Sequence, residues 1–113
     1  MSAANYNLVI DQGSDFAEDL IVKESDVAKD LTGYAARAQI RSTPTSPDLA
    51  GSFTCTIPVP TTDGKINMAL PNAVSSAMSP GRYYYDLEIY TANDAYVKRL
   101  IQGEITLNPE ITR

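Results

Sequence analysis

Four carboxylates near the start of the chain are the first group of side chains that could perform chemistry. Asp11, Asp15, Glu18 and Asp19 lie within the nine-residue segment "DQGSDFAED". Carboxylate oxygens are the ligands that calcium prefers, so a cation site is one interpretation. The spacing is not that of the EF-hand loop, however, and part of the segment alternates like a strand. We therefore expect solvated turn charges and predict no metal ligands.

Catalytic groups are scarce. The chain has no histidine, which removes the usual general base at neutral pH and the common serine triad. Cys55 is the single cysteine, and its alternating apolar surroundings favour a small core residue over a catalytic thiol. Asp86 and Glu88 form a carboxylate pair, but Arg82 and Lys98 are expected to be their cross-strand partners. We predict no catalytic residues, no cofactor and no enzymatic activity.

Composition bounds the class of protein. The 113 residues, 43% hydrophobic and 20% charged, suit one folded domain with a modest core. The formal net charge of −5 disfavours nucleic acids and anionic membranes as partners. The single cysteine excludes an internal disulfide, which fits folding in a reducing cytosol. No signal peptide is recognisable, and no apolar stretch approaches the ~20 residues of a membrane-spanning helix.

Alternation of apolar and polar residues with period two predicts strands along most of the chain. The expected strands lie at residues 7–10, 15–23, 34–41, 52–57, 65–70, 82–90 and 96–107. The segment "PNAVSSAM", residues 71–78, is the only plausible helix and allows two turns at most. This pattern predicts a β-sandwich with one short helix.

The last two expected strands have side chains that agree in one antiparallel register. If Tyr90 lies opposite Tyr96, opposite charges meet on the outer face and apolar residues meet on the inner face. The predicted pairs are Glu88–Lys98, Arg82–Glu104, Ile89–Val97, Tyr85–Ile101 and Tyr83–Gly103. Because a slip of one residue would move every side chain to the other face, several matching pairs favour this register.

Arg99 is anomalous in this register, because it falls on the inner face opposite Leu87. Three explanations are open: a bulge re-aims the side chain, its guanidinium reaches past the sheet edge, or it is buried with a carboxylate partner. We favour the first two, since burying a charge is expensive.

The tyrosines of "GRYYYDLEIY" follow a short corner, as a tyrosine does in immunoglobulin-like sandwiches. Tyr83 is expected to hydrogen-bond to the backbone upstream, and Tyr85 to occupy the place of the second cysteine of an antibody domain. Sheet packing is favoured over ligand binding for both rings. Tyr84, Tyr90 and Tyr96 are expected to be exposed and are our candidate protein-interface residues, since tyrosine joins a large area to a polar tip.

Four segments together resemble a family of small structural proteins from the virion modules of tailed bacteriophages, including phages of cyanobacteria and other aquatic bacteria. The segments are "NYNLVIDQGSDF", "DLTGYAARAQIR", "GRYYYDLEIY" and "VKRLIQGEITLNPEITR". Their order and spacing carry the resemblance, which runs from Asn5 to Arg113. It implies an immunoglobulin-like or similar β-sandwich that serves as a building block of the particle, with no catalytic residues to transfer.

Pattern and resemblance together predict an all-β, immunoglobulin-like antiparallel β-sandwich of about seven to eight strands with one short helix near residues 71–78. We expect one domain over residues 1–113, with short extended tails at both ends that order on contact with a neighbour. The expected function is structural, in the tail, baseplate or neck of a virion assembled in the bacterial cytoplasm. Its partners are then other virion proteins, and it is present in multiple copies in a symmetric assembly.

Two alternatives remain open. The first is capsid decoration in the same virion. The second is a module that binds a host-surface glycan, because Tyr84, Tyr90, Tyr96, Asp86 and Gln102 lie on one predicted face. The absence of tryptophan, the usual sugar-stacking residue, disfavours the second alternative.

Overall fold

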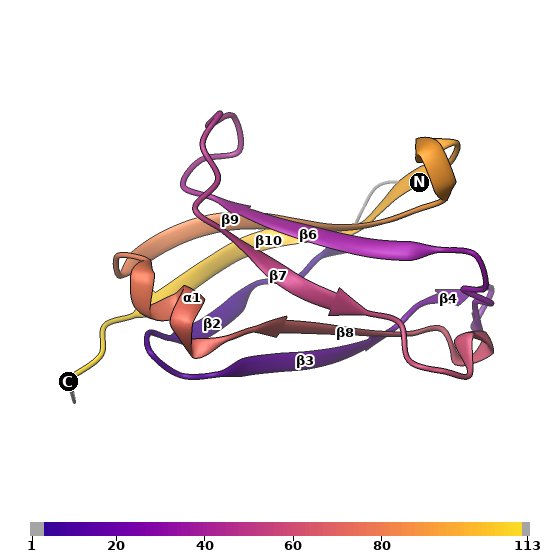
Figure 1. Ribbon diagram of the computed structural model, residues 1–113, viewed down its shortest axis with the longest axis horizontal. Coiled ribbons are helices and arrows are strands. Elements are labelled where there is room, and N and C mark those ends of the chain that lie inside the picture. Colours follow the sequence, from indigo (N-terminus) through magenta and orange to yellow (C-terminus); the bar gives the residue numbers. More distant parts are fainter. Residues whose placement is uncertain (1–3, 112–113) are drawn as a thin grey trace.

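The computed structural model describes residues 4–111, which form two main sheets packed face to face and a separate two-stranded sheet made of Lys23–Glu24 and Val27–Ala28 (Figure 1). The strands are β1 (Ala4–Asn5), β2 (Leu8–Asp11), β3 (Phe16–Ile21), β4 (Lys23–Glu24), β5 (Val27–Ala28), β6 (Ala35–Arg41), β7 (Gly51–Thr56), β8 (Lys65–Leu70), β9 (Gly81–Tyr90) and β10 (Val97–Asn108). The helices are α1 (Asn72–Ala77) and the short 3-10 turns η1 (Thr61–Asp63) and η2 (Ala92–Asp94).

One strand belongs to both sheets. The first half of β7 pairs with β6, and its second half, from Thr54, pairs with β8. The larger sheet therefore runs from β1 and β2 through β10, β9 and β6 to β7, and the smaller sheet from β7 through β8 to β3. β1 and β2 run parallel to β10, whereas the other neighbours are antiparallel. The predicted all-β sandwich with one short helix is confirmed.

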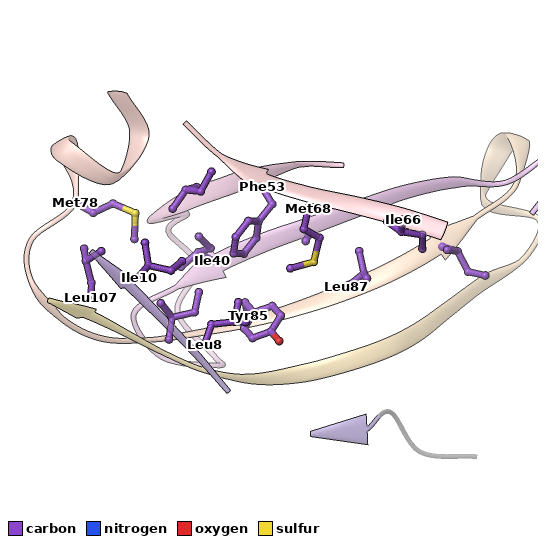
Figure 2. Packing of buried hydrophobic residues seen from close by; sticks show 14 of the residues in the cluster. Leu8, Ile10, Ile40, Phe53, Ile66, Met68, Met78, Tyr85, Leu87 and Leu107 are labelled. Atoms are coloured by element: carbon purple, nitrogen blue, oxygen red, sulfur yellow. The ribbon is translucent and has the colours of Figure 1, made fainter. Parts of the chain in front are cut away.

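The core lies between the two sheets and consists largely of the alternate residues of each strand that face inward (Figure 2). In β8 and β9 the predicted faces are confirmed: Ile66, Met68, Tyr85, Leu87 and Ile89 are at most 4% exposed. Burying such side chains stabilises the fold by about 1.5–3 kcal/mol each before conformational entropy is counted.

The register of β9 and β10 differs from the predicted one. Val97, not Tyr96, lies opposite Tyr90, because Tyr96 closes the connecting loop by accepting a hydrogen bond from the Thr91 amide (2.9 Å). A bulge between Arg99 and Ile101 then shifts the register again. The predicted direct pairs Glu88–Lys98, Ile89–Val97, Tyr85–Ile101, Tyr83–Gly103 and Leu87–Arg99 are therefore wrong. Arg82 lies opposite Thr106, but its guanidinium is still 3.9 Å from the carboxylate of Glu104, so the predicted charge pair is present on the diagonal.

The same bulge accounts for Arg99, so the first of the three explanations is confirmed. Before the bulge Arg99 lies opposite Glu88, on the outer side of the sheet. Its side chain is 54% exposed, and its guanidinium lies 3.1 Å from the carboxylate of Asp86. The extra residue lets the strand place an apolar side chain, Ile101, opposite Leu87 without burying the charge.

The cross-strand partners of the β9 carboxylates also differ from prediction. Glu88 pairs with Arg37 of β6 at 2.5 Å, and Asp86 pairs with Arg99. The predicted partners Arg82 and Lys98 were wrong for two reasons: β6, on the other side of β9, supplies Arg37, and the bulge in β10 brings Arg99 to Asp86.

Both expected tails lie partly outside the described residues, which exclude residues 1–3 and 112–113. Ala4 and Asn5 pair with β10 as the short strand β1. At the other end, the Glu110 amide donates a hydrogen bond to the side-chain oxygen of Gln12 (3.0 Å), and Ile111 is 89% exposed.

β1 and β2 keep one register along β10 but are interrupted at Tyr6 and Asn7. The Tyr6 amide still donates to the carbonyl of Gln102 (2.8 Å). The Glu104 amide, however, donates to the side-chain oxygen of Asn7 (3.0 Å) instead of a backbone carbonyl. The Asn7 side chain thus satisfies a backbone donor at the interruption.

The carbonyl of Tyr6 turns inward at this interruption and accepts a hydrogen bond from the Tyr85 hydroxyl (2.5 Å). Gly103 lies opposite Tyr85, and a Cβ on Gly103 would be 2.3 Å from the Tyr6 carbonyl oxygen. Gly103 is therefore a glycine because the edge strand approaches it closely, not because a tyrosine covers it.

The predicted tyrosine corner is confirmed, since the Tyr83 hydroxyl donates to the Ser79 carbonyl at 2.5 Å. We expect Tyr83→Phe to lower the free energy of unfolding by about 1 kcal/mol, the typical net value of one hydrogen bond. Urea unfolding followed by circular dichroism measures this. Tyr84→Phe, on the neighbouring outward ring, serves as the control and should change stability by less than about 0.5 kcal/mol. Equal effects in both variants would contradict the assignment.

Candidate functional site

The outer face is the solvent-facing side of β6, β9 and β10, and its side chains form ordered rows. β9 supplies the centre of each row, β10 one end and β6 the other. The rows, read from β10 to β6, are Arg99–Glu88–Arg37, Gln102–Asp86–Gln39 and Glu104–Tyr84–Arg41. Charges, amides and one aromatic ring thus alternate across three strands.

The outer face is hollowed into a groove of about 610 Å³, here called the outer-face groove. Tyr84 and Asp86 lie in its centre line, on β9. Pro44, from the β6–β7 loop, lines the side toward β6, and Asn5 and Asn7 line the side toward β10. That loop rises above the larger sheet in Figure 1. The other lining side chains come from the rows just described: Gln39, Arg41, Arg99, Gln102 and Glu104.

Hydrogen bonds donated by two arginines hold the polar side chains of the groove in place. Arg99 approaches Asp86 and donates to the side-chain oxygen of Gln102 (3.2 Å). Arg41 donates to the side-chain oxygen of Gln39 (3.0 Å) and to the carbonyl of Ser46 in the β6–β7 loop (3.2 Å). Each glutamine uses its oxygen in these contacts, which leaves its NH₂ group as a donor for another partner.

A second surface lies at the end of the β9–β10 hairpin. Here Tyr96 and Val97 are 45% and 42% exposed. Tyr90 stacks against the guanidinium of Arg37, whose central carbon lies 4.3 Å from the ring centre. Arg37 also pairs with Asp94 of η2 (3.4 Å), which ties the hairpin turn to β6. We call Tyr90, Tyr96 and Val97 the hairpin-end patch.

The three candidate tyrosines do not share one face. Tyr84 lies in the groove, and Tyr90 lies six residues along β9, about 20 Å away at 3.3 Å per residue. Tyr96 turns toward Tyr34, which packs against the core, with 5.9 Å between the ring centres. Tyr84 and Tyr90 share the outer face of β9 as expected, whereas Tyr96 does not, because the predicted register at the hairpin was wrong by one residue. Whether these residues contact a partner stays a prediction.

The acidic segment near the N-terminus directs its carboxylates to separate partners. The hydrogen bonds are Asn72 to Asp15, Asn67 to Asp19, Asn108 to Asp11 and Tyr6 to Glu18, at 2.7–3.2 Å. Within residues 4–111, no three histidine, cysteine, aspartate or glutamate side chains are placed together to hold a metal ion. These carboxylates join strands and turns; Asp15, for example, accepts from the Asn72 amide that begins α1.

Cys55 packs against the core, and burial raises the pKa of its thiol from 9.0 to about 11. The thiolate is the reactive form, so we expect folded Cys55 to react with a disulfide reagent at pH 8 about a hundredfold more slowly than the unfolded chain. Absorbance of the chromophore released by the disulfide reagent measures the reaction rate of Cys55. Equal rates with and without denaturant would contradict its placement against the core.

The raised pKa also means that the contribution of the Cys55 thiol to stability is complete below pH 9 and declines as the pH rises toward 11.

The fold and its surface define an all-β sandwich with a polar groove on its larger sheet. No protein-family model matches the chain, and no curated protein matches it. Among solved structures, the chain is similar to CopC from Methylosinus trichosporium OB3b, with 10% identity, 99% of this chain and 90% of that chain covered, and a TM-score of 0.51. It is also similar to InlP from Listeria monocytogenes, with 16% identity over 94% of this chain and a TM-score of 0.50.

These likenesses establish the β-sandwich fold and nothing finer, because both identities are low. The chain spans 28% of the length of InlP, so that similarity concerns one part of a larger protein. Across the part of the chain that the structure describes, no helix is long and apolar enough to cross a membrane.

Proposed function

We propose that this chain is a non-enzymatic structural component of a tailed bacteriophage virion, where it acts through protein–protein contacts in the tail, baseplate or neck. Its partners are other virion proteins, and it is assembled in the bacterial cytoplasm in multiple copies. The proposal rests on the sequence resemblance and on a β-sandwich fold that suits a building block.

The hairpin-end patch is the observation that carries the contact role. Tyr90, Tyr96 and Val97 present aromatic and aliphatic area at one end of the molecule. Arg37 holds Tyr90 from one side, and the Thr91 side chain fixes the Tyr96 amide by accepting its hydrogen bond (2.9 Å). A rigid patch loses little conformational entropy on association, which favours its use as a contact.

Removal of the patch tests this role. The double variant Tyr96→Ala, Val97→Ala should still fold, with a modest loss of stability from the lost contact between Tyr96 and Tyr34, since both side chains are more than 40% exposed. The variant is supplied in cells infected with a phage whose genome lacks this gene and is otherwise wild type. We expect its incorporation into particles to fall at least tenfold relative to the wild-type chain supplied in the same way. Quantitative immunoblotting of purified particles measures incorporation.

The matched control is Val9→Ala, because Val9 is 67% exposed on β2, away from the hairpin. It should be incorporated at the wild-type level. Normal incorporation of the folded double variant would reject the hairpin-end patch as the contact surface.

A further inference from the structure

The outer-face groove plays no part in the proposed contact role and offers chemistry of its own. We propose that this groove binds a neutral oligosaccharide, with Tyr84 beneath a sugar ring and amide and carboxylate groups around it. The inference stands on the groove and is independent of where the protein resides.

The polar groups of the groove suit hydroxyl ligands. Within residues 4–111, the NH₂ groups of Gln39, Gln102 and Asn7 make no hydrogen bond to protein, while the oxygens of the same side chains are occupied. One carboxylate oxygen of Asp86 faces Arg99, and the other is available. A sugar hydroxyl donates and accepts at once, so it can donate to a carboxylate and accept from an amide.

These groups are also preorganised. Arg99 positions Gln102 and Asp86, and Arg41 positions Gln39, at distances between 3.0 and 3.2 Å. The strands beneath them are central in the sheet, so the backbone that carries them is rigid. Binding then costs little side-chain ordering, which is one of the losses that weaken binding to a flexible polar surface.

The charge of the groove selects a neutral ligand. Its lining contains two arginines, Arg41 and Arg99, and two carboxylates, Asp86 and Glu104, so the formal charges cancel. The whole chain carries −5, which adds a long-range field that disfavours anions. A uronic-acid polymer or a nucleic-acid strand is therefore a worse match than an uncharged glycan.

The size of the groove fits a short oligosaccharide. A volume of about 610 Å³ falls within the 300–1,000 Å³ typical of small-molecule sites. Tyr84 lies between Glu104 and Arg41 in its row and supplies the aromatic group of the site. Tyrosine offers an apolar ring with a polar tip, which suits the two faces of a sugar.

The first experiment screens the purified protein on an array that carries neutral and uronic-acid-containing bacterial glycans. The best neutral oligosaccharide is then titrated into ¹⁵N-labelled protein and followed by NMR. We expect binding to neutral glycans and chemical-shift changes at β6, β9 and β10 around Gln39, Asp86 and Gln102.

Variants connect binding to the groove. Tyr84→Ala and Gln102→Ala should each weaken binding of that oligosaccharide at least tenfold, with unchanged spectra elsewhere as proof of folding. The matched control is Thr106→Ala, an exposed residue on the same face of β10 as Gln102 but outside the groove lining, which should change affinity by less than twofold. Absence of neutral glycan binding, binding restricted to acidic glycans, or wild-type affinity in both groove variants would each overturn the proposal.

Discussion

Replacing Gly103 with alanine is expected to lower the free energy of unfolding by about 3 kcal/mol. The added Cβ would lie 2.3 Å from the carbonyl oxygen and 2.8 Å from the carbonyl carbon of Tyr6. Both are backbone atoms of the edge strand, which cannot rotate away as a side chain does. The strand must move, and the hydrogen bond from Tyr85 to the Tyr6 carbonyl is then lost.

Chemical unfolding of Gly103→Ala, with NMR of the Tyr6 and Asn7 amides, tests this expectation. Gly51→Ala is the matched control, because Gly51 also lies in a strand without a positive φ, and an added Cβ there would meet only side-chain atoms, at 3.2 Å or more. It should cost much less than Gly103→Ala, because side chains can shift where the backbone of Tyr6 cannot. If Gly103→Ala were as stable as wild type, the close approach of Tyr6 to β10 would be wrong.

Replacing Phe53 with alanine is expected to cost about 4 kcal/mol, the usual size for a buried phenylalanine. Phe53 is 6% exposed, and its ring packs against Phe16 of the smaller sheet and Tyr85 of the larger, with centres 6.1 and 5.8 Å away. Phe53 is also the last residue of β7 that pairs with β6 before β7 crosses to β8. The variant therefore removes contacts that join both sheets (Figure 2).

Since a loss of this size is a large part of the stability of a small domain, Phe53→Leu provides a milder second variant. It should cost about 1.5 kcal/mol or less and keep the fold. Thr54→Ala, the exposed neighbour, controls for changes to the strand itself. The urea midpoint should be lowest for Phe53→Ala, higher for Phe53→Leu and highest for Thr54→Ala. Equal midpoints for Phe53→Ala and Thr54→Ala would contradict the packing of Phe53.

The faces of the strands could be predicted from the sequence because burial imposes a period of two. Ile66, Met68 and Leu70 of β8 are all fully buried, as the alternation in "KINMAL" indicates. The tyrosine corner was predictable for a similar reason, since Pro-Gly before three tyrosines defines a local geometry. These features depend on neighbouring residues alone.

The register of β9 and β10 depended on backbone geometry that alternation does not encode. Asn93 and Asp94 adopt positive φ values of 57° and 53° in the hairpin turn, which lengthens the loop by including Tyr96. The bulge at Leu100 adds a second shift. Arg99 was the one signal of that bulge, because a charge on an apolar face needs a local change of direction.

The groove could be predicted only in part. Tyr84, Asp86 and Gln102 were expected on one face, and the structure does bring them together. Gln39 and Arg41 were recognised as outward residues of their own strand, but their position beside β9 follows from the order of strands in the sheet. Asn5, Asn7 and Pro44 reach the groove through the edge strand and a long loop, which no local pattern specifies.

The copy number of this chain in purified particles tests the central claim most directly. Quantitative mass spectrometry against the major capsid protein supplies the number. The account predicts small multiples of three or six copies, as tail, baseplate or neck symmetry requires, whereas hundreds of copies would move the protein to capsid decoration. Absence of the chain from clean particles would contradict a structural role in the virion.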